Sequence, residues 1–219
     1  MKPQLVVLCI FIIPVASCAA EQWSAPPFCH GYPCPEYKLI QDHGAFQERL
    51  YKRSLWAETP VQSTAYSDVA DGFGRIFKFT GGDNEAGQCE TLPTTIPTAV
   101  FYLESDYGTG NVSTAVFMPP NGKVPKPTDA SVKLVERASA TVFVRVFDGL
   151  PTESNALSNV QQLRNDLGDA GKRFDPCCFV GAGYESLLTL IGRHNEVWVF
   201  ADSDSDTDYL GNENSQSSE

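Results

Sequence analysis

Apolar and polar positions alternate along two similar stretches of the chain. In the first stretch, residues 37–42 form an extended run, and residues 46–61 follow after a turn with alternating apolar positions, which predicts two strands. A helical spacing comes next and ends at Gly81-Gly82, a common helix terminator. Residues 97–103 and 112–118 then predict two further strands. The apolar positions of the expected helix are Val69, Phe73, Ile76 and Phe77.

The same order of elements recurs in the second stretch. Residues 132–136 and 140–147 predict two strands, a helical pattern opens at Pro151, and residues 178–184 and 196–200 predict two more strands. The copies lie about 95 residues apart, which indicates a duplicated ββαββ unit. Neither half alone supplies a sheet large enough to be stable. We therefore expect an α+β fold with one twisted, eight-stranded antiparallel sheet, curved or closed, and a helix from each half.

The N-terminus has the pattern of a cleavable signal peptide covering residues 1–20. Lys2 gives a positive start, residues 5–16 are almost entirely apolar, and small residues follow at positions 17–20. The apolar run is shorter than the roughly 20 residues of a membrane-spanning helix, and no later stretch approaches that length. The protein is therefore expected to be secreted. An alternative interpretation is a lipoprotein signal that would acylate Cys18.

After the signal peptide, the sequence divides into three parts. Residues 21–35 form a leader rich in Cys and Pro, residues 36–201 form one domain, and residues 202–219 form an acidic tail, expected to be disordered, with six acids and no base. The whole chain carries a formal net charge of −11. This acidity argues against binding to nucleic acid or to anionic membranes. We expect the domain to be a monomer.

The cysteines that remain after cleavage should mostly pair in an oxidising compartment. Cys29 and Cys34 are close enough in sequence to close a short loop. Cys89 is expected to join Cys177 or Cys178, so that one thiol is left over. Asn111-Val112-Ser113 is a sequon, and we expect a glycan on Asn111 because the chain is secreted.

The sequence contains few motifs that indicate catalysis or metal binding. The sequence contains none of the standard nucleophile-elbow, phosphate-loop, dinucleotide or zinc-protease motifs, so an enzyme is not expected. Cys29, His30 and Cys34 allow a zinc interpretation, but a disulfide-closed leader accounts for the cysteines more simply. The acids of the tail match part of a calcium-loop pattern, yet Thr207 stands where the sharp turn needs Gly, which favours a solvated tail.

Several sequence blocks together resemble the SOUL heme-binding family over nearly all of residues 35–200. The last two blocks are the most specific. In chain order the blocks are Phe46-Gln-Glu-Arg-Leu-Tyr, Trp56-Ala-Glu-Thr-Pro-Val, Gly72-Phe-Gly-Arg-Ile-Phe-Lys-Phe with Gly81-Gly82, Thr94-Thr-Ile-Pro, Thr141-Val-Phe-Val-Arg-Val-Phe-Asp-Gly and Arg193-His-Asn-Glu-Val-Trp. The resemblance implies a twisted β-barrel of two such repeats flanked by two helices.

The same resemblance implies non-covalent binding of heme or a related porphyrin, without catalysis, in an apolar groove along the first helix. A groove of this kind gains free energy by burying a large, flat, apolar macrocycle. The implied apolar contacts are Val69, Phe73, Ile76 and Phe77, and Arg75 matches a basic position that suits a propionate.

This sequence departs from the family pattern at three positions. Leu50 stands where one branch of the family has a proposed iron-ligating histidine, and Ala70 and Thr189 replace basic residues of the groove. His43 and His194 remain as candidate iron ligands, and we expect iron coordination to contribute little. An alternative function is an extracellular protein-interaction module, for which the amphipathic residues 160–167 are the candidate surface.

Overall fold

The computed structural model describes residues 23–86, 90–103, 110–119, 122–186, 189 and 191–202. Within these residues the chain forms nine strands, two α-helices and a short 3-10 helix at Pro27–Cys29. The elements are β1 Tyr37–Asp42, β2 Gln47–Tyr51, β3 Ser54–Val61, α1 Tyr66–Thr80, β4 Thr98–Leu103, β5 Asn111–Phe117, β6 Lys133–Arg137, β7 Ala140–Phe147, α2 Glu153–Asp169, β8 Cys178–Gly183 and β9 Asn195–Phe200.

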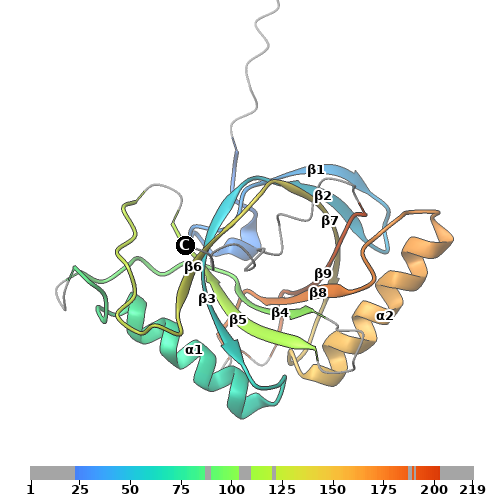
Figure 1. Ribbon diagram of the computed structural model, residues 1–219. Helices are drawn as coiled ribbons and strands as arrows, with labels where there is room; N and C mark the ends of the chain where they lie inside the picture. The colour runs from blue at the N-terminus through green and yellow to red at the C-terminus, as the bar shows by residue number, and fades with distance from the viewer. Residues whose placement is uncertain are drawn as a thin grey trace, which may run out of the picture.

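All described strands belong to one antiparallel sheet in the order β1-β2-β7-β9-β8-β4-β5-β3-β6. The sheet curls into a half-barrel, and both helices lie against its outer surface (Figure 1). This confirms the predicted α+β barrel-like fold. The predicted number of eight strands was wrong, because residues 46–61 form two strands rather than one. The chain bends at Lys52 and Arg53, so that β2 pairs with β7 while β3 pairs with β5 and β6.

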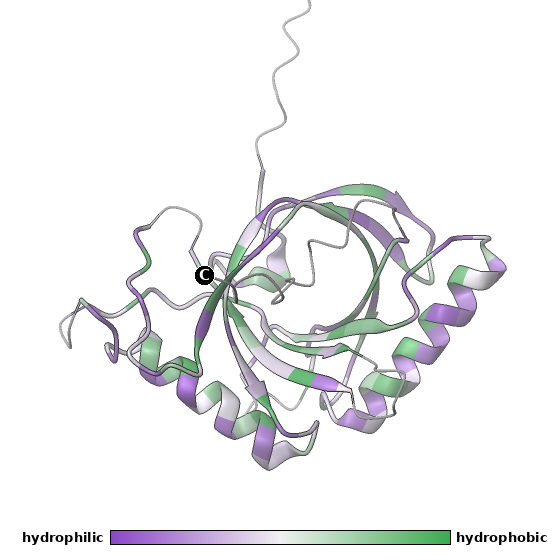
Figure 2. Cartoon of the chain, in the orientation of Figure 1, coloured by the Kyte–Doolittle hydropathy of each residue, from purple (hydrophilic) through white to green (hydrophobic). Residues whose placement is uncertain are grey.

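The strand pairing reflects the duplication. Tyr51 pairs with Ala140 and Ser54 pairs with Arg137, so the bent β2–β3 segment runs antiparallel to the bent β6–β7 segment. The two repeats also place their helices alike. Helix α1 packs on β3 and β5, and α2 packs on β7 and β9. Both helices mix hydrophilic and hydrophobic residues along their length (Figure 2), and part of the apolar residues of each is buried in the layer between helix and sheet.

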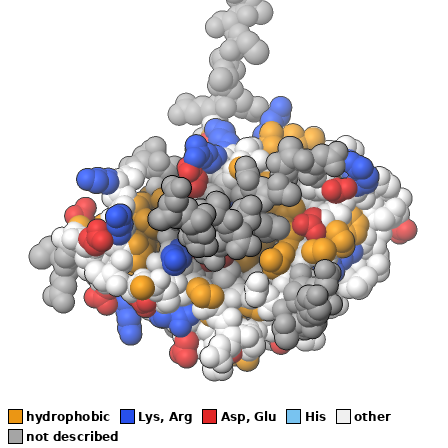
Figure 3. Space-filling model, viewed as in Figure 1, with side chains coloured by type: hydrophobic (Ala, Val, Ile, Leu, Met, Phe, Trp, Pro, Cys, Tyr) orange, Lys and Arg blue, Asp and Glu red, His pale blue; other side chains and the backbone are white. Residues whose placement is uncertain are grey.

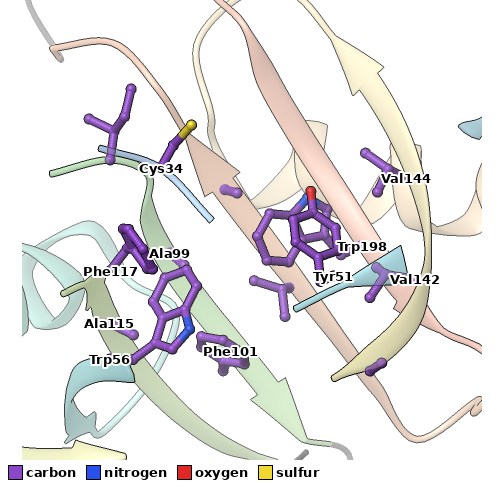
Figure 4. Packing of buried hydrophobic residues seen from close by; sticks show 14 of the residues in the cluster. Cys34, Tyr51, Trp56, Ala99, Phe101, Ala115, Phe117, Val142, Val144 and Trp198 are labelled. Atoms are coloured by element: carbon purple, nitrogen blue, oxygen red, sulfur yellow. The ribbon is translucent and has the colours of Figure 1, made fainter. Parts of the chain in front are cut away.

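Aromatic side chains fill the middle of the half-barrel. Trp56 packs edge-on against Phe101 and Trp198, with ring centroids 5.8 and 6.4 Å apart. Figure 4 shows Trp56, Phe101 and Phe117 on one side of this cluster, facing Tyr51 and Trp198 on the other. Burying each large apolar side chain contributes roughly 1.5–3 kcal/mol. These packed side chains therefore fill the middle of the half-barrel.

The Cys- and Pro-rich leader packs against the barrel. Cys29 and Cys34 form the expected disulfide, and the Cys29 side chain is fully buried. The bridge rules out the zinc interpretation, because both sulfurs are bonded to each other. Phe28 packs against the core, and the backbone N–H of Ile96 donates to the carbonyl of Pro33.

The structure decides one of the two alternative bridges predicted for Cys89 and leaves the other open. Cys178 is a buried thiol rather than part of a bridge, and its Sγ lies 3.2 Å from Asp175 Oδ2. Burial, reinforced by Asp175, raises the pKa of the Cys178 thiol well above its usual range. The predicted bridge from Cys89 to Cys178 was therefore wrong. Cys89 lies outside the described residues, as do the expected signal peptide and most of the acidic tail, so the alternative bridge to Cys177 stays a prediction.

Candidate functional site

Helix α1 sits unusually close to the sheet at Gly72. A Cβ atom on this glycine would lie 2.4 Å from Thr114 Oγ1 and 2.6 Å from a Val61 methyl group, so a larger residue does not fit without movement. Ile76 and Phe79 follow on the same face and are almost completely buried in the layer between helix and sheet. This face therefore fixes the position of α1, and Ile76 serves the core.

The structure gathers the other predicted apolar contacts on one flank of α1. Val69, Phe73 and Phe77 follow one another at intervals of one turn, and Val69 and Phe73 are half-buried. The ring of Phe77 stacks on that of Phe73 with centroids 6.1 Å apart and planes inclined by 20°. Phe77 remains 51% exposed. The flank, called here the aromatic flank and defined by Val69, Phe73 and Phe77, thus presents partly exposed apolar side chains to solvent.

Arg75 lies on the opposite flank of the same helix. Its Nη2 donates to the carbonyl oxygen of Pro60 at 2.7 Å. Together with Asp68 and Asp71 it lines an open cavity of about 550 Å³ beside the end of β3. Two carboxylates and one cation make this cavity net negative, which disfavours a ligand with carboxylate groups. The structure therefore does not bring Arg75 together with the aromatic flank.

A second cavity, which was not predicted from the sequence, lies at the bend between β2 and β3. Its volume is about 440 Å³, and Lys52, Arg53, Leu55 and Phe117 contribute to its lining. Both cations are largely exposed, and each pairs with a carboxylate, Lys52 with Glu36 and Arg53 with Glu136. Charged side chains of both signs are likewise interspersed around the face shown in Figure 3. The sequence signal was the interruption of apolar alternation at residues 52–53.

The two candidate iron ligands are engaged elsewhere. His43 stacks on Phe46 and its Nε2 lies 3.4 Å from Glu48 Oε2. His194 stacks face to face on Phe28 at 3.9 Å, and its Nε2 lies 2.8 Å from a carboxylate oxygen of Glu196. Neither histidine lines the α1 cavity or the bend cavity. Within the described residues, no group of three or more His, Cys, Asp or Glu side chains forms a metal cluster.

Glu196 is the centre of a buried polar network that sequence reasoning missed. Oε1 accepts a hydrogen bond from Arg49 Nη1 at 2.9 Å, and Oε2 accepts from Tyr184 Oη at 2.9 Å and from Trp198 Nε1 at 2.7 Å. Burial alone would raise the pKa of Glu196, but the charge of Arg49 and the hydrogen bonds of His194 and Trp198 hold it at about 2. The only sequence signal was one acid inside an apolar strand.

Two other predicted features have clear positions. Asn111 is exposed at the start of β5, so the sequon is accessible. The apolar face of α2 carries Val160, Leu163 and Leu167, and all three are buried against the sheet. That face is therefore used by the fold, which weakens the interaction-module alternative. Among the described residues, no helix combines the length and apolar character needed to span a membrane.

Comparison with known proteins gives a family match over most of the chain. The SOUL heme-binding protein family model matches residues 32–200. The chain is 29% identical to heme-binding protein 2 of Mus musculus over 172 residues, covering 75% of this chain and 84% of that protein. It is 35% identical to heme-binding protein 1 of Sus scrofa over 161 residues, covering 71% of this chain and 83% of that protein.

A solved structure shares the fold at low sequence identity. The C-terminal domain of EcmrR superposes with a TM-score of 0.54 at 12% identity, covering 76% of this chain and 98% of that domain. At this identity the likeness concerns the fold alone.

Proposed function

The chain belongs to the SOUL heme-binding protein family, and on that premise we propose that it binds heme or a related porphyrin non-covalently and does not catalyse a reaction. The family match and the names of the relatives support a binding role. The sequence supports it too, because it contains no catalytic motif.

The observation that carries the proposal is the aromatic flank of α1. A tetrapyrrole is a large, apolar macrocycle, and the partly exposed side chains of the aromatic flank offer an apolar surface against which it can be buried. The alternative location, the middle of the half-barrel, is filled by Trp56, Trp198 and their neighbours. The ligand is therefore assigned to the outer surface, where burying Phe77 drives binding.

Iron has a minor role in this proposal. The Nε2 atoms of His43 and His194 already face carboxylate oxygens, and neither histidine belongs to α1. Binding should therefore depend on the macrocycle and its propionates rather than on a metal–ligand bond.

We further propose that the protein is secreted as a glycoprotein. The N-terminal pattern motivates this, and two structural features support it. The Cys29–Cys34 disulfide suits an oxidising compartment. The exposed Asn111 is accessible to glycosylation.

A titration of the wild-type protein with hemin and with metal-free protoporphyrin tests the proposed binding. Hemin binding is followed at the Soret band, and protoporphyrin binding is followed by fluorescence. We expect both to bind at micromolar concentration with dissociation constants within about tenfold of each other, a difference of roughly 1.4 kcal/mol. If neither ring binds, the proposed function fails. If hemin binds far more tightly and His43→Ala or His194→Ala abolishes the difference, the iron-independent account is wrong.

A further inference from the structure

The interior of the half-barrel contains a cage around the carboxylate of Glu196. The carboxylate is fully buried, and the hydroxyl of Tyr184 and the indole N–H of Trp198 fix its orientation. Burial raises the pKa of Tyr184 well above its ordinary value, so this residue is a neutral hydrogen-bond donor. Glu196 Oε1 also lies 2.8 Å from His194 Nε2, and the two donors to Oε2 are uncharged, so Arg49 is the permanent cation beside this carboxylate.

Aromatic rings border the cage on the side from which Arg49 enters. The guanidinium carbon of Arg49 lies 4.4 Å from the centroid of the Tyr37 ring and 5.8 Å from that of Phe28. Tyr51 also contacts the guanidinium, because its hydroxyl accepts from Nη1 at 3.0 Å. A carboxylate combined with aromatic faces is the environment that recognises planar organic cations.

The guanidinium group of Arg49 lies in this environment and donates hydrogen bonds to the acceptors around it. Its Nη1 donates to Glu196, and its Nε and Nη2 both donate to Gln47 Oε1, at 2.9 and 2.7 Å. Only 1% of Arg49 is exposed. The N–H groups of the guanidinium thus point at acceptors supplied by β2 and β9, and the aromatic rings cover it.

We propose that the Glu196 cage is a binding site for a planar organic cation of the guanidinium class, which the chain fills with its own Arg49. The leader closes the site, because Phe28 stacks on His194 and the disulfide ties the neighbouring Cys29 to Cys34. The site is separate from the aromatic flank of α1, and its internal occupant excludes other ligands from this end of the barrel. The inference does not depend on tetrapyrrole binding.

The test removes the internal ligand and supplies a free one. In Arg49→Ala, ethylguanidinium replaces the lost part of the side chain, namely two carbons and the guanidinium. We expect ethylguanidinium to raise the melting temperature of Arg49→Ala by roughly 5–10 °C at about 100 times its dissociation constant. Isothermal titration should show one site. Ethylurea is a neutral molecule of nearly the same shape and should have no such effect.

Three matched proteins distinguish a cation site from a simple cavity and from general stabilisation by the additive. Wild type should not bind, because Arg49 occupies the cage. Arg145→Ala removes an arginine that pairs with Asp166 outside the cage and should not bind. The double variant Arg49→Ala/Glu196→Gln keeps the space but removes the charge, and it should lose most of the response to ethylguanidinium.

Every outcome of this test is decisive. If Arg49→Ala folds only with ethylguanidinium present, refolding yield replaces melting temperature and supports the proposal. Equal responses to ethylguanidinium and ethylurea would show a simple cavity and overturn it. Failure of ethylguanidinium to bind or refold Arg49→Ala would overturn it as well, and so would an equal response in Arg145→Ala.

Discussion

Arg49 Nη1 donates to Glu196 Oε1 at 2.9 Å, joining two strands that are not paired with each other in the sheet. Arg49 is on β2 and Glu196 is on β9, and β7 pairs with both strands from opposite sides. The contact crosses the inner surface of the sheet and ties the first repeat to the last strand of the second. Burying both charges costs desolvation free energy, so the net stabilisation depends on the hydrogen bonds that surround the pair.

The acid stability of the protein should depend on Glu196. Its pKa is about 2 in the folded protein against an ordinary value of 4.5. A lowered carboxyl pKa stabilises the fold above the unfolded value, and this stabilisation is lost as the pH falls from about 4.5 toward 2. The part of the free energy of unfolding that depends on this ionisation is on the order of 3 kcal/mol. Glu196→Gln should be less stable than wild type at pH 7, and it should lose less stability than wild type when the pH falls from 4.5 to 2.5.

Urea unfolding at several pH values measures this difference. Glu136→Gln removes an exposed carboxylate and serves as the control for the loss of one surface charge. An equal acid dependence in wild type and Glu196→Gln would contradict the assigned role of the Arg49–Glu196 pair.

The close approach of α1 to the sheet predicts opposite effects at two neighbouring glycines. Gly72→Ala would press a methyl group against Thr114 and Val61, and we expect it to destabilise the fold by about 1–3 kcal/mol. Gly74 lies one half-turn away with open space around it, so Gly74→Ala should stabilise the helix by about 0.5–1 kcal/mol. Denaturant unfolding of the two variants measures both effects. A Gly72→Ala protein as stable as wild type would show that the packing adjusts freely.

Processing of the N-terminus provides a separate prediction. Material secreted from a eukaryotic host should begin near Ala20 or Glu21 and carry a glycan on Asn111. N-terminal sequencing establishes the first residue, and peptide N-glycosidase should reduce the mass of wild type but not of Asn111→Gln. Secreted protein that begins at Met1 would contradict the signal-peptide interpretation.

Local patterns were enough to predict most elements of the fold. Alternation or short apolar runs identified most of the strands, and helical spacing identified α1 and α2, because one side of each helix is apolar and buried. The bend at Lys52 and Arg53 was missed. Alternating apolar residues on both sides of a bend look like one strand, and only the pairing of β2 with β7 and of β3 with β5 separates them.

The candidate site was predicted less completely than the fold. Spacing grouped Ile76 with Phe73 and Phe77, but the position of the sheet decides which part of the stripe is buried, and it buries Ile76. Arg75 is about half a turn from Phe73, and this places it on the other flank. Arg49 and Glu196 are far apart in sequence, so no local pattern links them; their contact exists only after β2 and β9 join β7.

The measurement that tests the central claim most directly compares hemin binding by Phe77→Asp and Leu157→Asp. Phe77 is on the aromatic flank of α1, and Leu157 is the matched control on α2, because the two side chains are 51% and 45% exposed. Partial exposure should allow both variants to fold, and circular dichroism checks this. We expect Phe77→Asp to weaken hemin binding at least tenfold, about 1.4 kcal/mol, because it places a charge against the macrocycle, while Leu157→Asp binds like wild type. Wild-type affinity in a folded Phe77→Asp protein, or an equal loss in both variants, would contradict the assignment of the ligand to this flank.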